Sequence, residues 1–267
     1  MKTLVIVIPS SGTYPGIWSR SLCINEGLMK GTMLPFFHRA MQEDMGIIVL
    51  NPNVNSYFDE ETSERKPIPY NDTPEKHVLY VWDRIISFTT AKDVLIIAYG
   101  EGGNHAKALI QARESVVLNK LRAIAFTESQ HTLSSDLSFG LSRVDSKATR
   151  DFLENHTLNW ITSDLPIGER DYEQEEQLGC ICVSAAPSNC SPGLLNSIAM
   201  DQIFDFFHYA CSDPTHTTEQ YWETVLHSKD SPIRQPSGSD DMKTTNEVLV
   251  TNLPLSTNWI ADNMVSK

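Results

Sequence analysis

The chain has 267 residues, of which 40% are hydrophobic, and a formal net charge of −13. This length suits one large α/β domain or two small ones. The negative charge repels a bare phosphate backbone, so direct nucleic-acid binding is not expected. The first apolar run, Leu4 to Ile8, is too short for a membrane span or a signal-peptide core. We therefore expect a globular chain that does not contact a membrane.

The cysteine pattern favours reduced thiols. Five cysteines are an odd number, and nothing in the sequence indicates an extracellular context for disulfides. Cys180 and Cys182, followed by Cys190 and His208, could be read as zinc ligands. However, the first two lie in an apolar strand-like run and lack the usual spacer of about two to four residues. The sequence predicts neither a metal nor a cofactor.

Five apolar runs rich in Val and Ile predict buried parallel strands. They are Thr3 to Ile8, Gly46 to Asn51, Asp93 to Ala98, Leu121 to Thr127 and Cys180 to Ala185. Helical patterns lie between them. Thr73 and Pro74 begin one helix, and another with apolar residues from Leu195 to Phe207 ends near Cys211. The alternation predicts an α/β fold with a doubly wound, mostly parallel sheet of strand order 2-1-3-4-5.

Two polar stretches fall outside this pattern. Asn53 to Asp72 is charged and contains Pro67 and Pro69, so we expect an excursion over the sheet edge or a disordered loop. The prediction for the whole chain is one domain, residues 1–211, followed by a polar, mostly disordered tail, residues 212–267. One apolar cluster in the tail could dock as a short amphipathic helix: Tyr221, Trp222, Val225 and Leu226.

The most informative segment reads as strand, sharp turn and helix around Gly100. In the nucleophile elbow of α/β-hydrolases, small residues stand two places before and two places after the nucleophile. Ala98 and Gly102 supply that spacing. Because glycine has no side chain, the apex of this predicted elbow carries no nucleophile.

With the predicted strand order, the loops after the first and third strands meet at the switch point where doubly wound sheets bind ligands. The pocket candidates come from these loops, the following helix and the end of the fourth strand. They are Ser10, Ser11, Gly12, Tyr99, Gly100, Glu101, Gly102, Gly103, His105 and Glu128. One alternative is a dinucleotide or small ligand bound at Gly100-x-Gly102, although His105 replaces the third glycine. Another is residual hydrolysis by a non-serine mechanism that uses His105 or His131 with Glu128.

Five segments carry a family resemblance: Trp18-Ser19-Arg20, Cys23-Ile24-Asn25-Glu26, Gly31 to Phe36, Ile47 to Asn53 and Tyr80 to Asp83. They resemble the cotranscriptional-regulator family that carries the Argonaute-binding-protein domain, an α/β-hydrolase-like fold. The likeness covers residues 1 to 211 and does not extend to the polar tail.

This resemblance implies a degenerate catalytic site. By position, the family's elbow serine corresponds to Gly100, its oxyanion-loop glycine to Ser10 and its base histidine to Cys190. Glu128 remains as the acid, where the family tends to have Asp. An acid alone cannot orient a base that is missing. The resemblance therefore implies a pseudo-hydrolase and not an enzyme.

The resemblance also implies an interaction module in the nucleus and cytoplasm. Its expected partners are proteins of Argonaute-linked silencing, chromatin or cotranscriptional RNA processing. The net charge favours basic protein surfaces over naked RNA. The partner-binding candidates are the acids of the polar excursion: Asp59, Glu60, Glu61 and Glu64.

Overall fold

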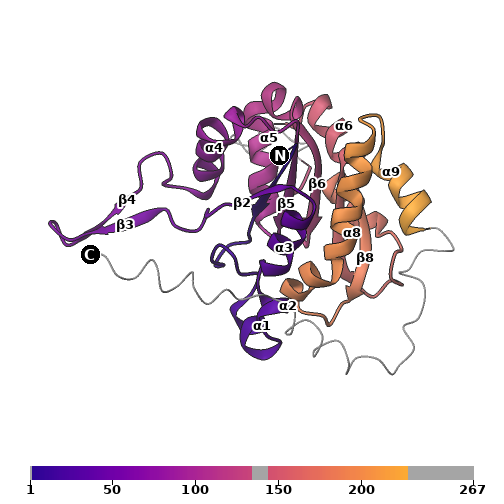
Figure 1. Cartoon of the computed structure of the whole chain (residues 1–267), viewed down its shortest axis with the longest axis horizontal. Helices are drawn as coiled ribbons and strands as arrows, with labels where there is room; N and C mark the ends of the chain where they lie inside the picture. Colours follow the sequence, from indigo (N-terminus) through magenta and orange to yellow (C-terminus); the bar gives the residue numbers. More distant parts are fainter. Residues whose placement is uncertain (1, 134–143, 228–267) are drawn as a thin grey trace. The chain divides into compact units, whose positions relative to one another are not determined.

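The computed structural model describes residues 2–133 and 144–227. Its main sheet has six strands in the order β2-β1-β5-β6-β7-β8, all parallel (Figure 1). The strands are β1 Thr3–Ile8, β2 Gly46–Val49, β5 Asp93–Tyr99, β6 Leu121–Thr127, β7 Thr157–Ser163 and β8 Ile181–Pro187. The predicted doubly wound, parallel α/β architecture is confirmed.

The strand order differs from the prediction in one detail, because β7 lies between β6 and β8 and was not predicted. Thr157 and Asn159 interrupt its apolar run, yet both are fully buried. The Thr157 hydroxyl donates to the Leu153 carbonyl at 2.6 Å, and Asn159 Oδ1 accepts the Ser129 N–H at 3.2 Å. Such partners allow polar side chains to occupy a buried strand.

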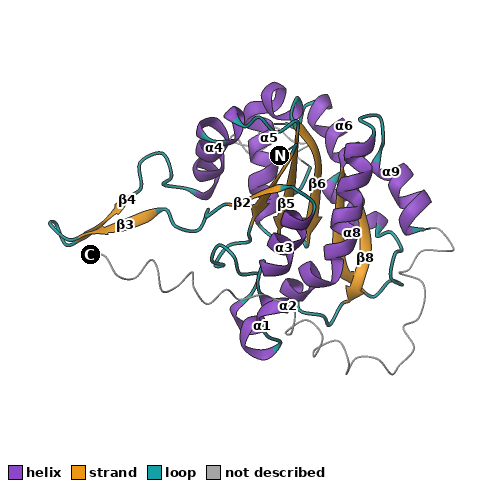
Figure 2. Cartoon of the chain, in the orientation of Figure 1, coloured by secondary structure: helices purple, strands orange, loops and turns teal. Residues whose placement is uncertain are grey.

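Helices cover both faces of the sheet (Figure 2). Helices α4, α5 and α6 pack against one another in sequence on one face, while α8 crosses β5 to β8 on the other. The helices are α1 Arg20–Asn25, α2 Leu28–Gly31, α3 Leu34–Gln42, α4 Pro74–Arg84, α5 Gly102–Leu118, α6 Lys147–His156, α7 Tyr172–Leu178, α8 Pro192–Ser212 and α9 Thr218–Tyr221. Among the helices in the described ranges, none has the length and apolar character needed to cross a membrane.

The hydrophobic core lies between the two helix layers. Ile6, Ile96 and Ile124, on the neighbouring strands β1, β5 and β6, are at most 1% exposed. Strands that are buried on both faces need apolar residues at successive positions, which explains the uninterrupted runs in the sequence. The aromatic residues Phe204 and Phe207 of α8 are also buried. The aromatic stripe of α8 is therefore part of the hydrophobic core.

The polar excursion is a β-hairpin, so the disordered-loop alternative is wrong. Strands β3 (Ser56–Asp59) and β4 (Glu64–Pro67) pair antiparallel as a separate sheet that projects beside α4 (Figure 2). The Asp59 carboxylate accepts the N–H groups of Glu61 at 2.9 Å and Thr62 at 3.3 Å, which closes the turn. These short strands are stabilised by hydrogen bonds in the turn and not by burial in a core. They therefore lack the hydrophobic periodicity from which strands are predicted.

The packed fold extends beyond the domain boundary expected at residue 211. Helix α8 ends at Ser212, and α9 is followed by a π-helical turn, Trp222–Leu226. Tyr221 and Leu226 are each 1% exposed. For residues 212–227 the expected boundary is therefore too early, because this apolar cluster packs on the domain. The rest of the expected tail, residues 228–267, lies outside the described residues.

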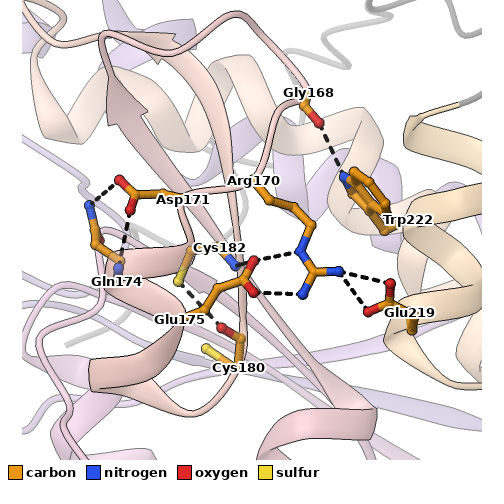
Figure 3. Close-up of polar contacts among 9 residues, drawn as sticks. All are labelled: Gly168, Arg170, Asp171, Gln174, Glu175, Cys180, Cys182, Glu219 and Trp222. Atoms are coloured by element: carbon orange, nitrogen blue, oxygen red, sulfur yellow. Dashed lines mark hydrogen bonds and ion pairs between the residues drawn. The ribbon is translucent and has the colours of Figure 1, made fainter.

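Arg170 connects this C-terminal segment to the domain (Figure 3). Its guanidinium forms a two-bond contact with Glu175 at 2.6 and 2.7 Å and donates to both Glu219 oxygens at 2.7 and 2.8 Å. The guanidinium carbon also lies 5.1 Å from the ring centroids of Tyr172 and Trp222. The hydrogen bonds with Glu175 raise the pKa of Arg170, so the charged form is stabilised.

We expect Arg170→Lys to lower the free energy of unfolding by about 2 kcal/mol, because lysine keeps the charge but loses the planar fork. Urea unfolding followed by tryptophan fluorescence measures this. The control is Arg113→Lys, whose two bonds to Asp83 lie on an exposed surface and should contribute less than about 1 kcal/mol. Equal losses in the two variants would contradict the anchoring role of Arg170.

Candidate functional site

The predicted elbow lies where β5 passes into α5. Gly100 follows β5 with φ +55°, in the left-handed region that favours glycine. Its N–H donates to the Thr127 carbonyl at 2.9 Å, and its carbonyl accepts the Gly103 N–H at 3.1 Å. The turn therefore has the backbone form of a nucleophile elbow without a side chain at its apex.

Two further glycines allow the start of α5 to approach the sheet. A Cβ atom on Gly102 would lie 2.3 Å from the Ile8 carbonyl oxygen. A Cβ atom on Gly103 would lie 1.8 Å from Ser129 Oγ. Both distances are too short for real contacts. The Ile8 carbonyl belongs to the backbone, so packing alone requires glycine at position 102, whereas at position 103 the Ser129 hydroxyl would have to move. The glycine pattern thus has an explanation that needs no bound dinucleotide.

Ser10 lies over the apex of the elbow. A Cβ atom on Gly100 would lie 2.5 Å from Ser10 Oγ, so this hydroxyl occupies the space that a nucleophile would need. Ser10 Oγ also accepts the Glu101 N–H at 3.3 Å. In α/β-hydrolases, the N–H of the residue after the nucleophile helps to stabilise the oxyanion. In this chain the corresponding N–H, that of Glu101, donates to the Ser10 hydroxyl.

Glu128 lies close enough to Tyr99 and to Cys190 for its charge to act on both side chains. Burial, followed by the charge of Glu128, raises the pKa of both the Tyr99 hydroxyl and the Cys190 thiol. The Cys190 thiol faces the Ser191 carbonyl at 3.7 Å. Glu128 Oε1 accepts the Thr162 N–H at 2.6 Å. The carboxylate predicted to be the acid is thus engaged by backbone, and the position predicted for the base holds a thiol whose raised pKa favours the protonated form.

The two histidines of the residual-hydrolase alternative are buried. His131 is 1% exposed, with Nε2 donating to the Leu178 carbonyl at 3.1 Å and Nδ1 accepting the Ser129 hydroxyl at 2.7 Å. His105 is 6% exposed, and burial lowers its pKa. Within the described residues, no hydrogen bond joins either histidine to Glu128. The structure therefore does not bring together the histidine and the carboxylate that the residual-hydrolase alternative requires.

The pH dependence of stability tests the burial of His131. Burial, then the charge of Lys107, lowers the pKa of His131 from 6.5 to about 4. The unfolded chain takes up this proton near pH 6.5, so the contribution of His131 is present above pH 6.5 and is lost as the pH falls towards 4. Its size is on the order of 3 kcal/mol.

We expect His131→Gln to flatten the fall in unfolding free energy between pH 6.5 and 4, as measured by urea titrations across that window. The variant can be less stable at every pH, so the slope is the readout. Asn155→Gln, which removes no titratable group and lies at an exposed hydrogen bond, is the control and should keep the wild-type slope. A wild-type slope for His131→Gln would show that His131 is not buried in its neutral form.

A cavity of 350 Å³ lies beside the elbow. Of the predicted pocket residues, Gly12 and Tyr99 line it. The other lining residues come from the loop after β1, the start of α1 and the start of α8, and include Tyr14, Trp18 and Arg20. The sequence reasoning missed these three because they follow no strand directly. The only signal was the presence of Trp18 and Arg20 in a segment of family resemblance.

A second cavity of 350 Å³ connects the loop after β1 with the base of the hairpin. Gly12, Thr13 and Tyr14 line both cavities. The hairpin side of the second cavity is formed by residues 53–56 and Arg65. Asn53 fixes this arrangement, because its Nδ2 donates to the carbonyls of Ser10 and Thr13 at 2.9 Å each.

The four partner-binding candidates lie at the hairpin tip. Asp59 is engaged within the hairpin, where the Lys66 ammonium holds its pKa below the ordinary value. Glu60, Glu61 and Glu64 are exposed and form no ion pair within the part of the chain that the structure describes. Three of the four candidates thus have carboxylates available to a partner.

The cysteines do not form a metal centre in the described ranges. All five thiols are free, and Cys180 and Cys182 are buried at the start of β8. His208 instead contacts Glu43 at 2.9 Å. Among the described residues, no group of three or more His, Cys, Asp or Glu side chains could hold a metal ion.

The fold and the elbow define a class: a doubly wound α/β protein with a hydrolase-type turn whose apex is glycine. The model of the Arb2 domain family matches residues 1–167, and the chain belongs to this family.

Among curated relatives, the cotranscriptional regulator ARB2A homolog of Dictyostelium discoideum is 32% identical over 61% of this chain and 48% of its own length. The Xenopus tropicalis homolog is 31% identical over 62% of this chain and 49% of its own length. The chain thus spans about half the length of these relatives. The structure of the histone deacetylase Clr3 aligns with a TM-score of 0.50 and 12% identity, over 79% of this chain and 32% of Clr3. That likeness concerns the fold alone.

We expect Gly100→Ser to be destabilised by about 1–3 kcal/mol, because serine is strained at positive φ and contacts Ser10. Neither the wild type nor this variant should hydrolyse p-nitrophenyl acetate, since triad members act as a unit and the predicted base position holds Cys190 instead of histidine. Gly100→Ala is the matched control, which separates backbone strain from the hydroxyl. Esterase turnover by the wild type that disappears in Glu101→Gln or His105→Gln would contradict the site description.

Proposed function

We propose that this chain is a catalytically inactive α/β-hydrolase-like protein that acts in gene regulation by binding other proteins. The observation that carries the proposal is the Ser10 hydroxyl, which fills the space over Gly100 and accepts the Glu101 N–H. The Ser10 side chain therefore occupies both the space that a nucleophile at position 100 would need and the N–H group that would bind an oxyanion. The protonated Cys190 thiol at the base position agrees with this account.

Membership of the Arb2 domain family and relatives named as cotranscriptional regulators support the regulatory role. We infer that the protein acts in the nucleus and is also present in the cytoplasm. Its partners belong to Argonaute-linked silencing or chromatin. RNA is retained only through such a protein, because the net charge of −13 disfavours direct contact.

The acidic hairpin tip is the proposed contact surface. Glu60, Glu61 and Glu64 supply exposed negative charge on an element that projects beside α4 (Figure 1). Such charge speeds encounter with a basic surface and weakens the complex as salt rises. Asp59 has a different role, since its carboxylate closes the turn. A test of charge must therefore leave Asp59 in place.

The test is the triple variant Glu60→Lys, Glu61→Lys and Glu64→Lys in the full chain. The matched control carries the same charge change at exposed positions elsewhere: Glu154→Lys, Glu176→Lys and Glu223→Lys. Quantitative co-precipitation with Argonaute and with chromatin proteins should fall for the hairpin variant alone, while both variants keep the wild-type melting temperature. Equal falls would mean that net charge, and not the hairpin, governs binding. Retardation of short RNA by the purified chain at physiological salt would also count against the proposal.

A second candidate function is the binding of a small ligand in the cavity beside the elbow. Its volume of 350 Å³ and its lining by Tyr14, Trp18, Arg20 and Tyr99 favour this candidate, since ligand pockets measure roughly 300–1,000 Å³. Native mass spectrometry of the purified chain tests it, because a retained ligand adds a defined mass.

A further inference from the structure

The hairpin has an open backbone edge. Strands β3 and β4 pair only with each other among the described residues. In an antiparallel pair, alternate residues of each strand direct their N–H and C=O groups away from the partner strand. Each outer edge therefore presents unpaired backbone groups. An isolated two-stranded hairpin is also marginally stable, so a third strand would stabilise it.

The two edges of the hairpin differ in protection. Strand β4 reads Glu64-Arg65-Lys66-Pro67, and charged residues with proline are the features that block strand addition. Strand β3 carries Tyr57 and Phe58, which are 48% and 59% exposed. Because they are successive residues, they lie on opposite faces of the ribbon. The edge of β3 is thus unprotected and offers aromatic surface on both faces.

A cavity adjoins the start of β3. The 350 Å³ cavity at the hairpin base is lined by Val54, Ser56 and Arg65 on the hairpin side and by Tyr14 on the other, so it suits an uncharged side chain of a bound segment. In recognition by strand addition, main-chain hydrogen bonds supply affinity and pockets for side chains supply specificity. The hairpin therefore carries an open edge along β3 and a pocket at the start of the same strand.

The negative charge at the hairpin tip indicates which kind of segment could bind beside β3. Glu60 and Glu61 follow β3 directly, and Glu64 stands opposite Asp59 in the register. Like charges placed opposite each other destabilise a strand pair unless a cation relieves them. Lys66 relieves Asp59, whereas the three glutamates form no ion pair within the described residues. A strand beside β3 would therefore gain from Lys or Arg side chains.

From these observations we propose that the outer edge of β3 binds an extended, basic segment of a partner protein by strand addition, with one side chain of that segment in the cavity at the hairpin base. The inference rests on the proposed function and specifies how the acidic hairpin holds its partner. The backbone of β3 provides the binding edge, and the glutamates at the tip select for basic residues.

The probe for the experiment is the peptide acetyl-Lys-Val-Lys-Val-Lys-Val-Lys-amide, titrated into the full chain. Hydrogen exchange followed by NMR should show slowed amides at Ser56 and Phe58, the alternate residues of β3 whose N–H groups face away from β4, because Asn55, one residue earlier, already accepts the Ile68 N–H. Two N-methylated peptides provide the sharpest comparison, one modified at every valine and one at every internal lysine. In an added strand only one of these sets faces β3. One modified peptide should therefore lose about tenfold or more in affinity while the other stays close to the parent.

Protein variants complete the test. Phe58→Lys should weaken peptide binding about tenfold by protecting the edge, and Phe88→Lys, at another exposed aromatic residue, is the matched control. No binding, equal effects of the two N-methylated sets, or equal binding of the peptide with Glu in place of Lys would overturn the inference. If the triple lysine variant still abolishes partner capture after such a result, the proposed function stands and only strand addition fails.

Discussion

The close contact between the loop after β1 and the start of α5 determines the character of the site. Parallel strands β1 and β5 end side by side, so their loops meet at the edge of the sheet. Gly102 allows α5 to approach the Ile8 carbonyl, and Gly100 makes the turn at positive φ. The same closeness brings Ser10 over the apex. The hydrolase-type turn is thus present, and the space over its apex is filled by a side chain of a neighbouring loop.

The structure separates a rigid framework from a projecting arm. The sheet is buried between two helix layers, and Arg170 holds the C-terminal segment to the domain through two hydrogen bonds to Glu219 and a contact with the Trp222 ring. The hairpin, in contrast, has no core and depends on its turn and on the anchor from Asn53. A surface of this kind can change its charge and aromatic residues without disturbing the sheet. Segments that project from a rigid scaffold commonly carry binding residues.

The sequence was most informative where burial dictates residue type. Five strands, the long helix α8 and the glycine turn follow from apolar runs and from backbone sterics, and the structure contains them all. Strand β7 could not be predicted in this way, because Asn159 is buried by virtue of hydrogen bonds that join distant segments. The hairpin depends on the local bonding of Asp59. Trp18 and Arg20 line the elbow cavity because of their position in the tertiary structure, which hydrophobic periodicity along the sequence does not predict.

The most direct test of the central claim is the hydrogen-exchange rate of the Glu101 amide, measured by NMR. If Ser10 Oγ occupies this donor, the amide exchanges slowly in the wild type and at least about tenfold faster in Ser10→Ala. The Gly100 amide, which donates to the Thr127 carbonyl, should keep its rate in both proteins and serves as the internal control. A Glu101 amide that exchanges equally fast with and without the Ser10 hydroxyl would contradict the claim that the protein fills its own oxyanion site.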